Sequence, residues 1–122
     1  TDISGFGLGP HLSDICKSSK LSAEIKLNKE ILINKNIGIL ENFKSTGFDN
    51  NYSSSVNEIL ISDSNKLKNI LYDPQTNGPL LLSIHEKDQI EFEKKFQLKL
   101  GFRPILLGKF KKSEDKLINV ID

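Results

Sequence analysis

The sequence predicts a single α+β domain in which helices cover a mixed β-sheet. Its 122 residues are enough for one compact domain and too few for two. Segments with helical and strand periodicity follow one another in the order helix, strand, helix, helix, strand, helix, strand, strand. With 37% apolar and 27% charged residues, the composition is ordinary for a soluble globular protein, so these segments can share one core.

Four segments carry a helical pattern. The first holds Leu8, Leu12, Ile15 and Cys16 at helical spacing. Pro10 suits its first turn, where a missing amide hydrogen is harmless. The second covers residues 31–43, and the third runs from the candidate N-cap Ser64 to residue 71. Residues 86–100 fit a strand as well as a helix, but their Glu, Lys and Gln content and a following Gly101 favour a helix.

Four other segments carry strand patterns. Residues 23–27 alternate apolar and polar side chains, which is typical of a half-buried strand. Residues 80–84 are strongly apolar, and two closing strands are predicted at residues 104–110 and 117–121. Residues 45–55 are polar and rich in Ser and Asn, which predicts a loop.

Charge and hydropathy exclude several classes of protein. The 17 basic and 16 acidic side chains leave a net charge of +1, and acids interleave the lysines of the last third. A nucleic-acid-binding domain would show a basic excess instead. The sequence has neither a bilayer-spanning apolar stretch nor a signal peptide. We therefore expect a cytoplasmic protein that binds neither nucleic acid nor membrane.

The numbers of Cys, His and Met residues add to this interpretation. Cys16 is the single cysteine, so an internal disulfide is impossible, and its helical spacing predicts a small core residue. With two His and one Cys the sequence offers no zinc constellation; His11 fits a helix start and His85 an exposed strand end. The chain has no Met, so we expect residues 1–122 to be a single domain cut from a larger protein.

The first candidate site is the glycine-rich stretch Thr-Asp-Ile-Ser-Gly-Phe-Gly-Leu at residues 1–8. Closely spaced glycines let backbone amides approach an anion, and the start of the following helix favours negative charge. Asp2 beside this turn could hold a magnesium ion that bridges phosphates. Glycine-rich turns before helices are common, however, so a purely structural turn remains an alternative.

The second candidate site is Asp-Pro-Gln-Thr-Asn-Gly at residues 73–78. On physical grounds alone this is a rigid turn, because proline follows aspartate and an Asn-Gly pair closes it.

Together the two segments resemble a known superfamily. Residues 1–8 are similar to the TD[VI][ST]GFGL segment that opens the second domain of aminoimidazole ribonucleotide synthetase, thiamine-monophosphate kinase and selenophosphate synthetase. Residues 73–81 resemble DPQTSGGLL, which within that superfamily points to the selenophosphate synthetase (selenide, water dikinase) family. The resemblance implies an α+β fold like the carboxy-terminal domain of aminoimidazole ribonucleotide synthetase.

The resemblance also implies a reaction. The family makes selenophosphate from selenide, ATP and water, releasing AMP and phosphate, with magnesium and a monovalent cation. The catalytic Cys or selenocysteine and Lys belong to an amino-terminal domain that is missing here. No catalytic residue is therefore expected in this chain, and alone it should be inactive and bind neither ATP nor magnesium. The missing domain is the implied partner, and the full-length enzyme is expected to be a homodimer.

Individual site residues follow from the resemblance. Asp2 falls on the family's metal-binding aspartate, and Thr1, Gly5 and Gly7 fall on the cofactor-binding turn that supports it. Asn51 matches the Asn of a GGTxRN loop and is the remaining cofactor-binding candidate.

The sequence departs from the family at five positions, and these departures keep alternatives open. Asn50 removes a cation that could face phosphate, and Pro79 removes an amide donor. The other changes are Pro10 for Gly, Asn77 for Ser and Phe48 for Thr. One alternative is another enzyme of the superfamily, which the Asp-Pro-Gln-Thr segment disfavours. The other is a non-catalytic module for protein binding or structural support.

Overall fold

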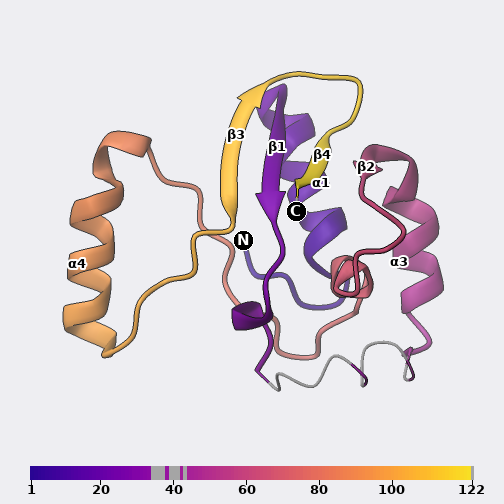
Figure 1. The fold of residues 1–122 in the computed structure, drawn as a ribbon, viewed down its shortest axis with the longest axis horizontal. Coiled ribbons are helices and arrows are strands. Elements are labelled where there is room, and N and C mark those ends of the chain that lie inside the picture. Colours follow the sequence, from indigo (N-terminus) through magenta and orange to yellow (C-terminus); the bar gives the residue numbers. More distant parts are fainter. Residues whose placement is uncertain (34–37, 39–41, 43, 122) are drawn as a thin grey trace.

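The fold is built on a four-stranded mixed sheet (Figure 1). The computed structural model describes residues 1–33, 38, 42 and 44–121. Within these residues the strands lie in the order β2-β4-β1-β3; β1 is antiparallel to β3, and β4 is parallel to both β1 and β2. Their bounds are Leu21–Lys26 for β1, Ile59–Leu60 for β2, Gly108–Lys112 for β3 and Ile118–Ile121 for β4.

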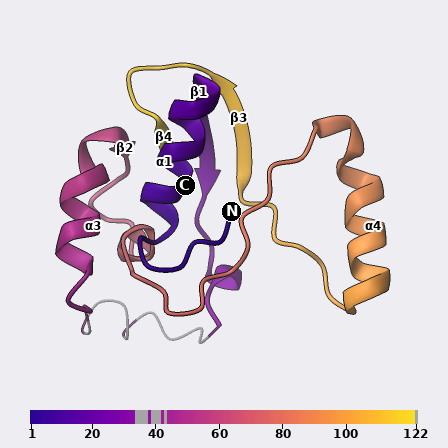
Figure 2. The ribbon, with the colours of Figure 1, turned by 180° about the vertical axis from the view of Figure 1, so that it is seen from behind.

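Three α-helices accompany the sheet in the described residues: α1 (Leu8–Ser19), α3 (Phe48–Ser55) and α4 (Gln89–Leu100). Helix α1 packs against the sheet, α3 packs against α1, and α4 stands apart from both (Figure 2). Four short 3₁₀ turns lie at Lys29–Ile31, Val56–Glu58, Lys68–Leu71 and Glu86–Asp88. None of the helices that the structure describes is long and apolar enough to cross a membrane.

The hydrophobic core lies between α1 and one face of the sheet. Alternation along β1 and β4 directs Ala23, Ile25, Ile118 and Val120 into it. From α1 the core receives Leu8, Leu12 and Cys16. The burial of Cys16 confirms its prediction as a core residue, and burial also raises the pKa of its thiol.

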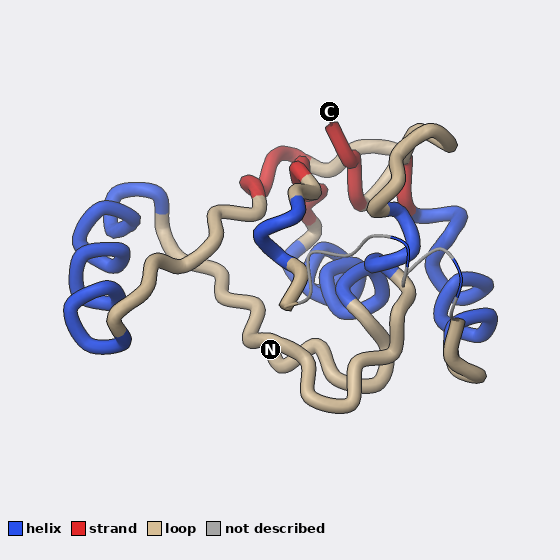
Figure 3. The backbone as a smooth tube through the Cα atoms, turned by 60° about the horizontal axis from the view of Figure 1, so that its bottom comes forward, coloured by secondary structure: helices blue, strands red, loops and turns tan. Residues whose placement is uncertain are grey.

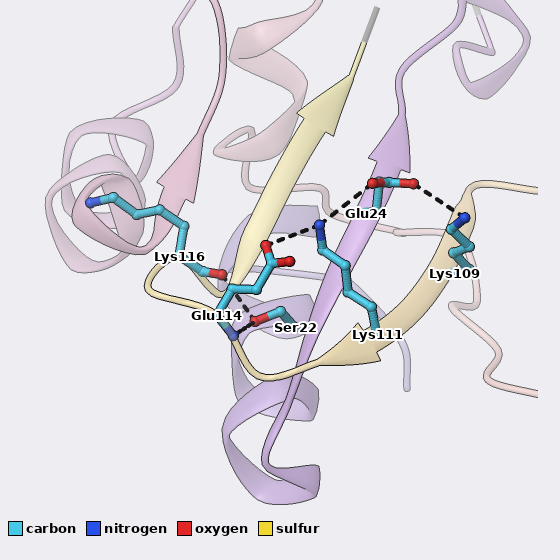
Figure 4. Close-up of polar contacts among 6 residues, drawn as sticks. All are labelled: Ser22, Glu24, Lys109, Lys111, Glu114 and Lys116. Carbon is cyan, nitrogen blue, oxygen red and sulfur yellow. Dashed lines mark hydrogen bonds and ion pairs between the residues drawn. The ribbon is translucent and has the colours of Figure 1, made fainter.

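The opposite face of the sheet is polar (Figure 4). Glu24 pairs with Lys109 and Lys111 of β3, each at 3.5 Å, and Lys111 also contacts Glu114 at 3.0 Å. The buried Ser22 hydroxyl donates to the Lys116 carbonyl at 3.0 Å and accepts from the Glu114 amide at 2.8 Å. These contacts fasten the turn after β3 to β1.

Several predicted elements are confirmed. Strand β1 covers residues 23–26 of the predicted 23–27, β4 covers residues 118–121 of the predicted 117–121, and α1 follows the glycine-rich turn with Pro10 in its first turn. The ambiguous segment 86–100 is a 3₁₀ turn followed by α4, and Gly101 caps the helix in the left-handed region at φ 79°.

Other predictions are wrong or only partly right. Residues 80–84 form no strand beyond a single bridge at Leu80, and the strand predicted from residue 104 begins at Gly108. Of the helix predicted for residues 64–71, only the 3₁₀ turn Lys68–Leu71 forms, because the Asn65 side chain accepts the Leu67 amide hydrogen and competes with helical bonding. Most of the helix predicted for residues 31–43 lies outside the described residues.

The predicted loop at residues 45–55 contains helix α3 instead. Its buried residues are Phe48, Asn51 and Ser55, spaced as on one helical face. Two of these three are polar, so the apolar periodicity that reveals most helices is absent. Strand β2 was missed because it has only two residues.

Candidate functional site

The two candidate motifs lie far apart in the sequence and side by side in the structure. Asp2 forms an antiparallel bridge with Leu80, and Ser4 forms a parallel bridge with Gln75. The backbone bonds are Thr1 N to Leu81 O at 2.8 Å, Leu81 N to Thr1 O at 2.8 Å, Ile3 N to Pro79 O at 3.2 Å and Gly5 N to Gln75 O at 2.8 Å. The Gly78 amide also donates to the Ser4 hydroxyl at 2.8 Å. We refer to residues 1–5 and 75–81 as the paired segments.

Two glycines allow the motifs to approach this closely. A Cβ on Gly7 would lie 2.9 Å from the carbonyl oxygens of both Asp73 and Leu71, and Gly7 also has a φ of 79°. A Cβ on Gly78 would lie 2.7 Å from the backbone of Ile3. Larger residues at either position would push the motifs apart. Gly5, by contrast, has a φ of 84° but open space around its Cβ position.

Asp2 is exposed at the edge of the paired segments. Its Oδ1 accepts the Ser4 amide hydrogen at 2.7 Å, and hydrogen bonding by Ser4 lowers the pKa of Asp2. The carboxylate is therefore ionised at neutral pH and offers the hard oxygen that magnesium prefers. The Thr1 hydroxyl donates to the Asp2 carbonyl at 3.2 Å, so Thr1 supports the backbone at this position.

A magnesium ion at Asp2 would need further ligands. Among residues 1–33, 38, 42 and 44–121 there is no group of three or more His, Cys, Asp or Glu that could hold a metal ion. The carboxylate thus fits magnesium as one ligand of a site that phosphates and other protein groups would complete.

Asn51 connects helix α3 to both motifs. Its side chain is buried, and Nδ2 donates to the Gly5 carbonyl at 3.2 Å and to the Tyr72 carbonyl at 3.1 Å. The structure therefore places the Asn51 side chain against the predicted glycine-rich turn, next to the paired segments. Because both bonds come from Nδ2, only the amide oxygen of Asn51 would be available to a ligand.

The two histidines have structural contacts. His11 Nε2 lies 3.2 Å from the Ser4 carbonyl oxygen, and its ring meets the exposed Phe6 edge-on at 5.6 Å. His85 precedes the 3₁₀ turn Glu86–Asp88, and its Nδ1 accepts the Lys87 amide hydrogen at 3.3 Å.

The second motif also contains a partly buried carboxyl, that of Asp73, which the sequence did not reveal. Burial raises the pKa of Asp73, and Gln75 Nε2 donates to Asp73 Oδ2 at 2.7 Å. This hydrogen bond between two side chains of the turn stabilises its conformation. The Asp-x-Gln spacing could have indicated this hydrogen bond, since side chains two residues apart can meet across a tight turn.

A cavity of about 380 Å³ beside α3 was not predicted either. Its aromatic wall is formed by Phe48, Tyr52 and Tyr72, and the rings of the two tyrosines meet at 5.0 Å and 72°. Lys44 and Lys68 line the same cavity. No local pattern marks these residues, because they come from segments that only the fold brings together.

Comparison with known proteins provides independent information. No protein-family model matches the chain. It is 35% identical over 121 residues to a selenide, water dikinase of Haemophilus ducreyi, covering 97% of this chain and 34% of that protein. A selenide, water dikinase of Clostridioides difficile is 32% identical over 124 residues, covering 99% of this chain and 36% of that protein. The chain thus spans about a third of the length of the curated relatives it matches.

Proposed function

The chain is homologous over nearly its whole length to selenide, water dikinases, and from this premise we propose that it is the carboxy-terminal domain of a selenophosphate synthetase. In the complete enzyme it would form one wall of an ATP site, and the remaining domain would supply the catalytic groups. The observation that carries the proposal is the contact between the paired segments. The two motifs that resemble this family form one continuous hydrogen-bonded unit with Asp2 at its exposed edge.

Asp2 would coordinate magnesium in the complete enzyme. Magnesium bound to ATP neutralises phosphate charge and holds the phosphates in a fixed orientation. The Ser4 amide holds Oδ1 of Asp2 in place and keeps the carboxyl ionised, so Oδ2 is the oxygen that would face the metal. Gly7 and Gly78 would position this carboxylate indirectly, by letting the two motifs lie against each other.

The departures from the family pattern are compatible with this role. Pro79 lacks an amide hydrogen, yet its carbonyl accepts the Ile3 amide hydrogen and maintains the pairing. Asn77 and Asn50 are exposed and Pro10 occupies the first turn of α1, where proline is tolerated. None of these residues disrupts the unit that carries Asp2.

The proposal can be tested in a chimera. This chain would replace the matching third of the Haemophilus ducreyi enzyme, and selenide-dependent formation of AMP from ATP would be measured. We expect activity in the chimera, a loss of about 100-fold or more in the Asp2→Asn variant, and little change in the matched Asp14→Asn variant on the exposed face of α1. The isolated chain should form no AMP.

Three outcomes would contradict the proposal. A folded chimera without activity would favour the non-catalytic module. Full activity of the Asp2→Asn chimera would show that Asp2 is not needed to bind the metal. Selenide-dependent AMP formation by the isolated chain would refute the need for a second domain.

A further inference from the structure

The cavity beside helix α3 is formed by residues other than those of the paired segments. Helix α3 and strand β2 stand at the end of the domain opposite α4 (Figures 1, 2 and 3). The cavity lies against both, and its volume of about 380 Å³ is within the range of pockets that hold small molecules. The described residues that line it lie between positions 44 and 72, whereas the paired segments are residues 1–5 and 75–81.

One wall of the cavity is aromatic. The rings of Phe48 and Tyr52 are nearly parallel, at 11° and 6.5 Å, and the ring of Tyr72 meets both of them edge-on. Tyr52 is 45% exposed whereas Phe48 and Tyr72 are buried, so Tyr52 provides the accessible ring of this wall. Aliphatic side chains complete the apolar lining: Val56, Ile59 and Ile61. A planar ring fits such a wall, because aromatic rings pack in offset-stacked or edge-on arrangements.

The hydroxyl of Tyr72 gives the cavity an unused hydrogen-bond donor. Only 3% of Tyr72 is exposed, and none of the residues that the structure describes forms a hydrogen bond with its hydroxyl. Among those residues, the fully enclosed side-chain atoms without a partner are Ser13 Oγ and Glu58 Oε2, so the Tyr72 hydroxyl still reaches open space, which here is the cavity. Burial raises the pKa of Tyr72 to about 12, so at neutral pH the hydroxyl keeps its proton. A ligand with an acceptor atom would satisfy this donor.

Lys44 adds a positive charge to the cavity. Its Nζ lies 4.5 Å from the centre of the Phe48 ring, and no carboxylate within the described part of the chain pairs with it. The second lysine, Lys68, is already engaged, because its Nζ donates to the Asp63 carbonyl at 3.0 Å and lies 3.6 Å from the Asp63 carboxylate. Asp49 also lines the cavity, but it is exposed, so water and salt screen its charge. An ammonium without a counter-ion and a buried hydroxyl donor both favour an anionic acceptor.

We propose that this cavity binds a small aromatic carboxylate, whose ring packs on Tyr52 and whose oxygens accept hydrogen bonds from the Tyr72 hydroxyl and the Lys44 ammonium. The two oxygens of a carboxylate can accept from both donors at once, and a planar ring attached to it covers the apolar wall. This binding needs neither nucleotide nor magnesium and does not depend on the proposed enzymatic role.

Titration of the purified chain with benzoate, followed through the chemical shifts of backbone amides, tests the proposal. We expect saturable shifts in residues 48–56 and 68–72, with a dissociation constant of about 1 mM or lower. Tyr72→Phe and Lys44→Gln should each raise that constant at least about fivefold, because each removes a hydrogen bond to a charged group. The control Lys66→Gln changes an exposed lysine outside the cavity lining and should leave the constant unchanged. Far-UV circular dichroism checks that the variants fold.

Two related probes separate the contribution of the charge from that of the ring. Benzamide keeps the ring without the charge, and cyclohexanecarboxylate keeps the charge without the planar ring. Both should bind at least about fivefold more weakly than benzoate. The absence of saturable shifts up to about 20 mM benzoate overturns the proposal. Shifts spread over the exposed lysines, unchanged affinity in either Tyr72→Phe or Lys44→Gln, and equal affinity for the three probes each overturn it as well.

Discussion

Replacing Asn51 by alanine tests the link between helix α3 and the two motifs. Only 5% of Asn51 is exposed, and its Nδ2 is the donor to the carbonyl oxygens of Gly5 and Tyr72. The Tyr72 bond is buried and the Gly5 bond is partly buried, so water cannot fully replace either donor. The change therefore removes two hydrogen bonds and leaves two carbonyl oxygens poorly satisfied.

The expected loss of stability can be worked out from these contacts. A typical net hydrogen bond contributes about 1 kcal/mol, and a buried group left without a partner costs about 1–3 kcal/mol. We expect the free energy of unfolding of Asn51→Ala to fall by about 2–4 kcal/mol relative to a matched control. Asn50→Ala is that control: it lies next to Asn51 in α3, is exposed, and gains the same helix propensity.

Urea unfolding of the purified chain, followed by circular dichroism, measures the difference. The unfolding midpoint should fall in Asn51→Ala with little change in the urea dependence, and should stay near the wild-type value in Asn50→Ala. Asn51→Asp should cost more above the pKa of the new carboxyl, because a carboxylate would then face two carbonyl oxygens. Equal midpoints for the two alanine variants would refute the assignment of Asn51 as the connecting residue.

Two further predictions concern Gly7 in the first motif and Tyr72, which directly precedes the second. Gly7→Ala should lower the free energy of unfolding by about 2–4 kcal/mol, since its Cβ would meet the Leu71 carbonyl at 2.9 Å in addition to the strain of positive φ. Gly5→Ala carries only the strain, about 1–2 kcal/mol, so equal losses in urea unfolding would contradict the close approach at Gly7. Burial, with a smaller contribution from Tyr52, raises the pKa of Tyr72 to about 12, whereas in the unfolded chain it is about 10. Between these values only the unfolded state ionises, so stability should fall as pH rises from 10 to 12. Tyr72→Phe should show a smaller decline over this window, and an identical decline would exclude Tyr72 as its source.

The sequence predicted those helices and strands whose local residue pattern matches the surroundings that they have in the folded domain. Strand β1 alternates because one face of the sheet meets α1 and the other meets water. Helix α4 was predictable from helix-forming residues and the cap at Gly101, although it has no buried residue. The proximity of the two motifs was not predicted, since no periodicity within either segment indicates that they touch.

The tertiary structure alone decided where polar residues are buried and which strand-like segment enters the sheet. Asn51 faces inward because it donates to carbonyl oxygens of other segments, and the buried Ser55 donates to the Asn51 carbonyl within α3; a pattern of apolar residues cannot reveal either contact. Residues 80–84 are as apolar as a buried strand, but a strand needs a neighbour with open hydrogen-bonding groups, and Leu80 forms only the bridge to Asp2. Periodicity thus predicted the local conformation of α1, β1 and β4, whereas contacts between distant segments determined the site, because hydrogen-bond partners far along the chain leave no local trace in the sequence.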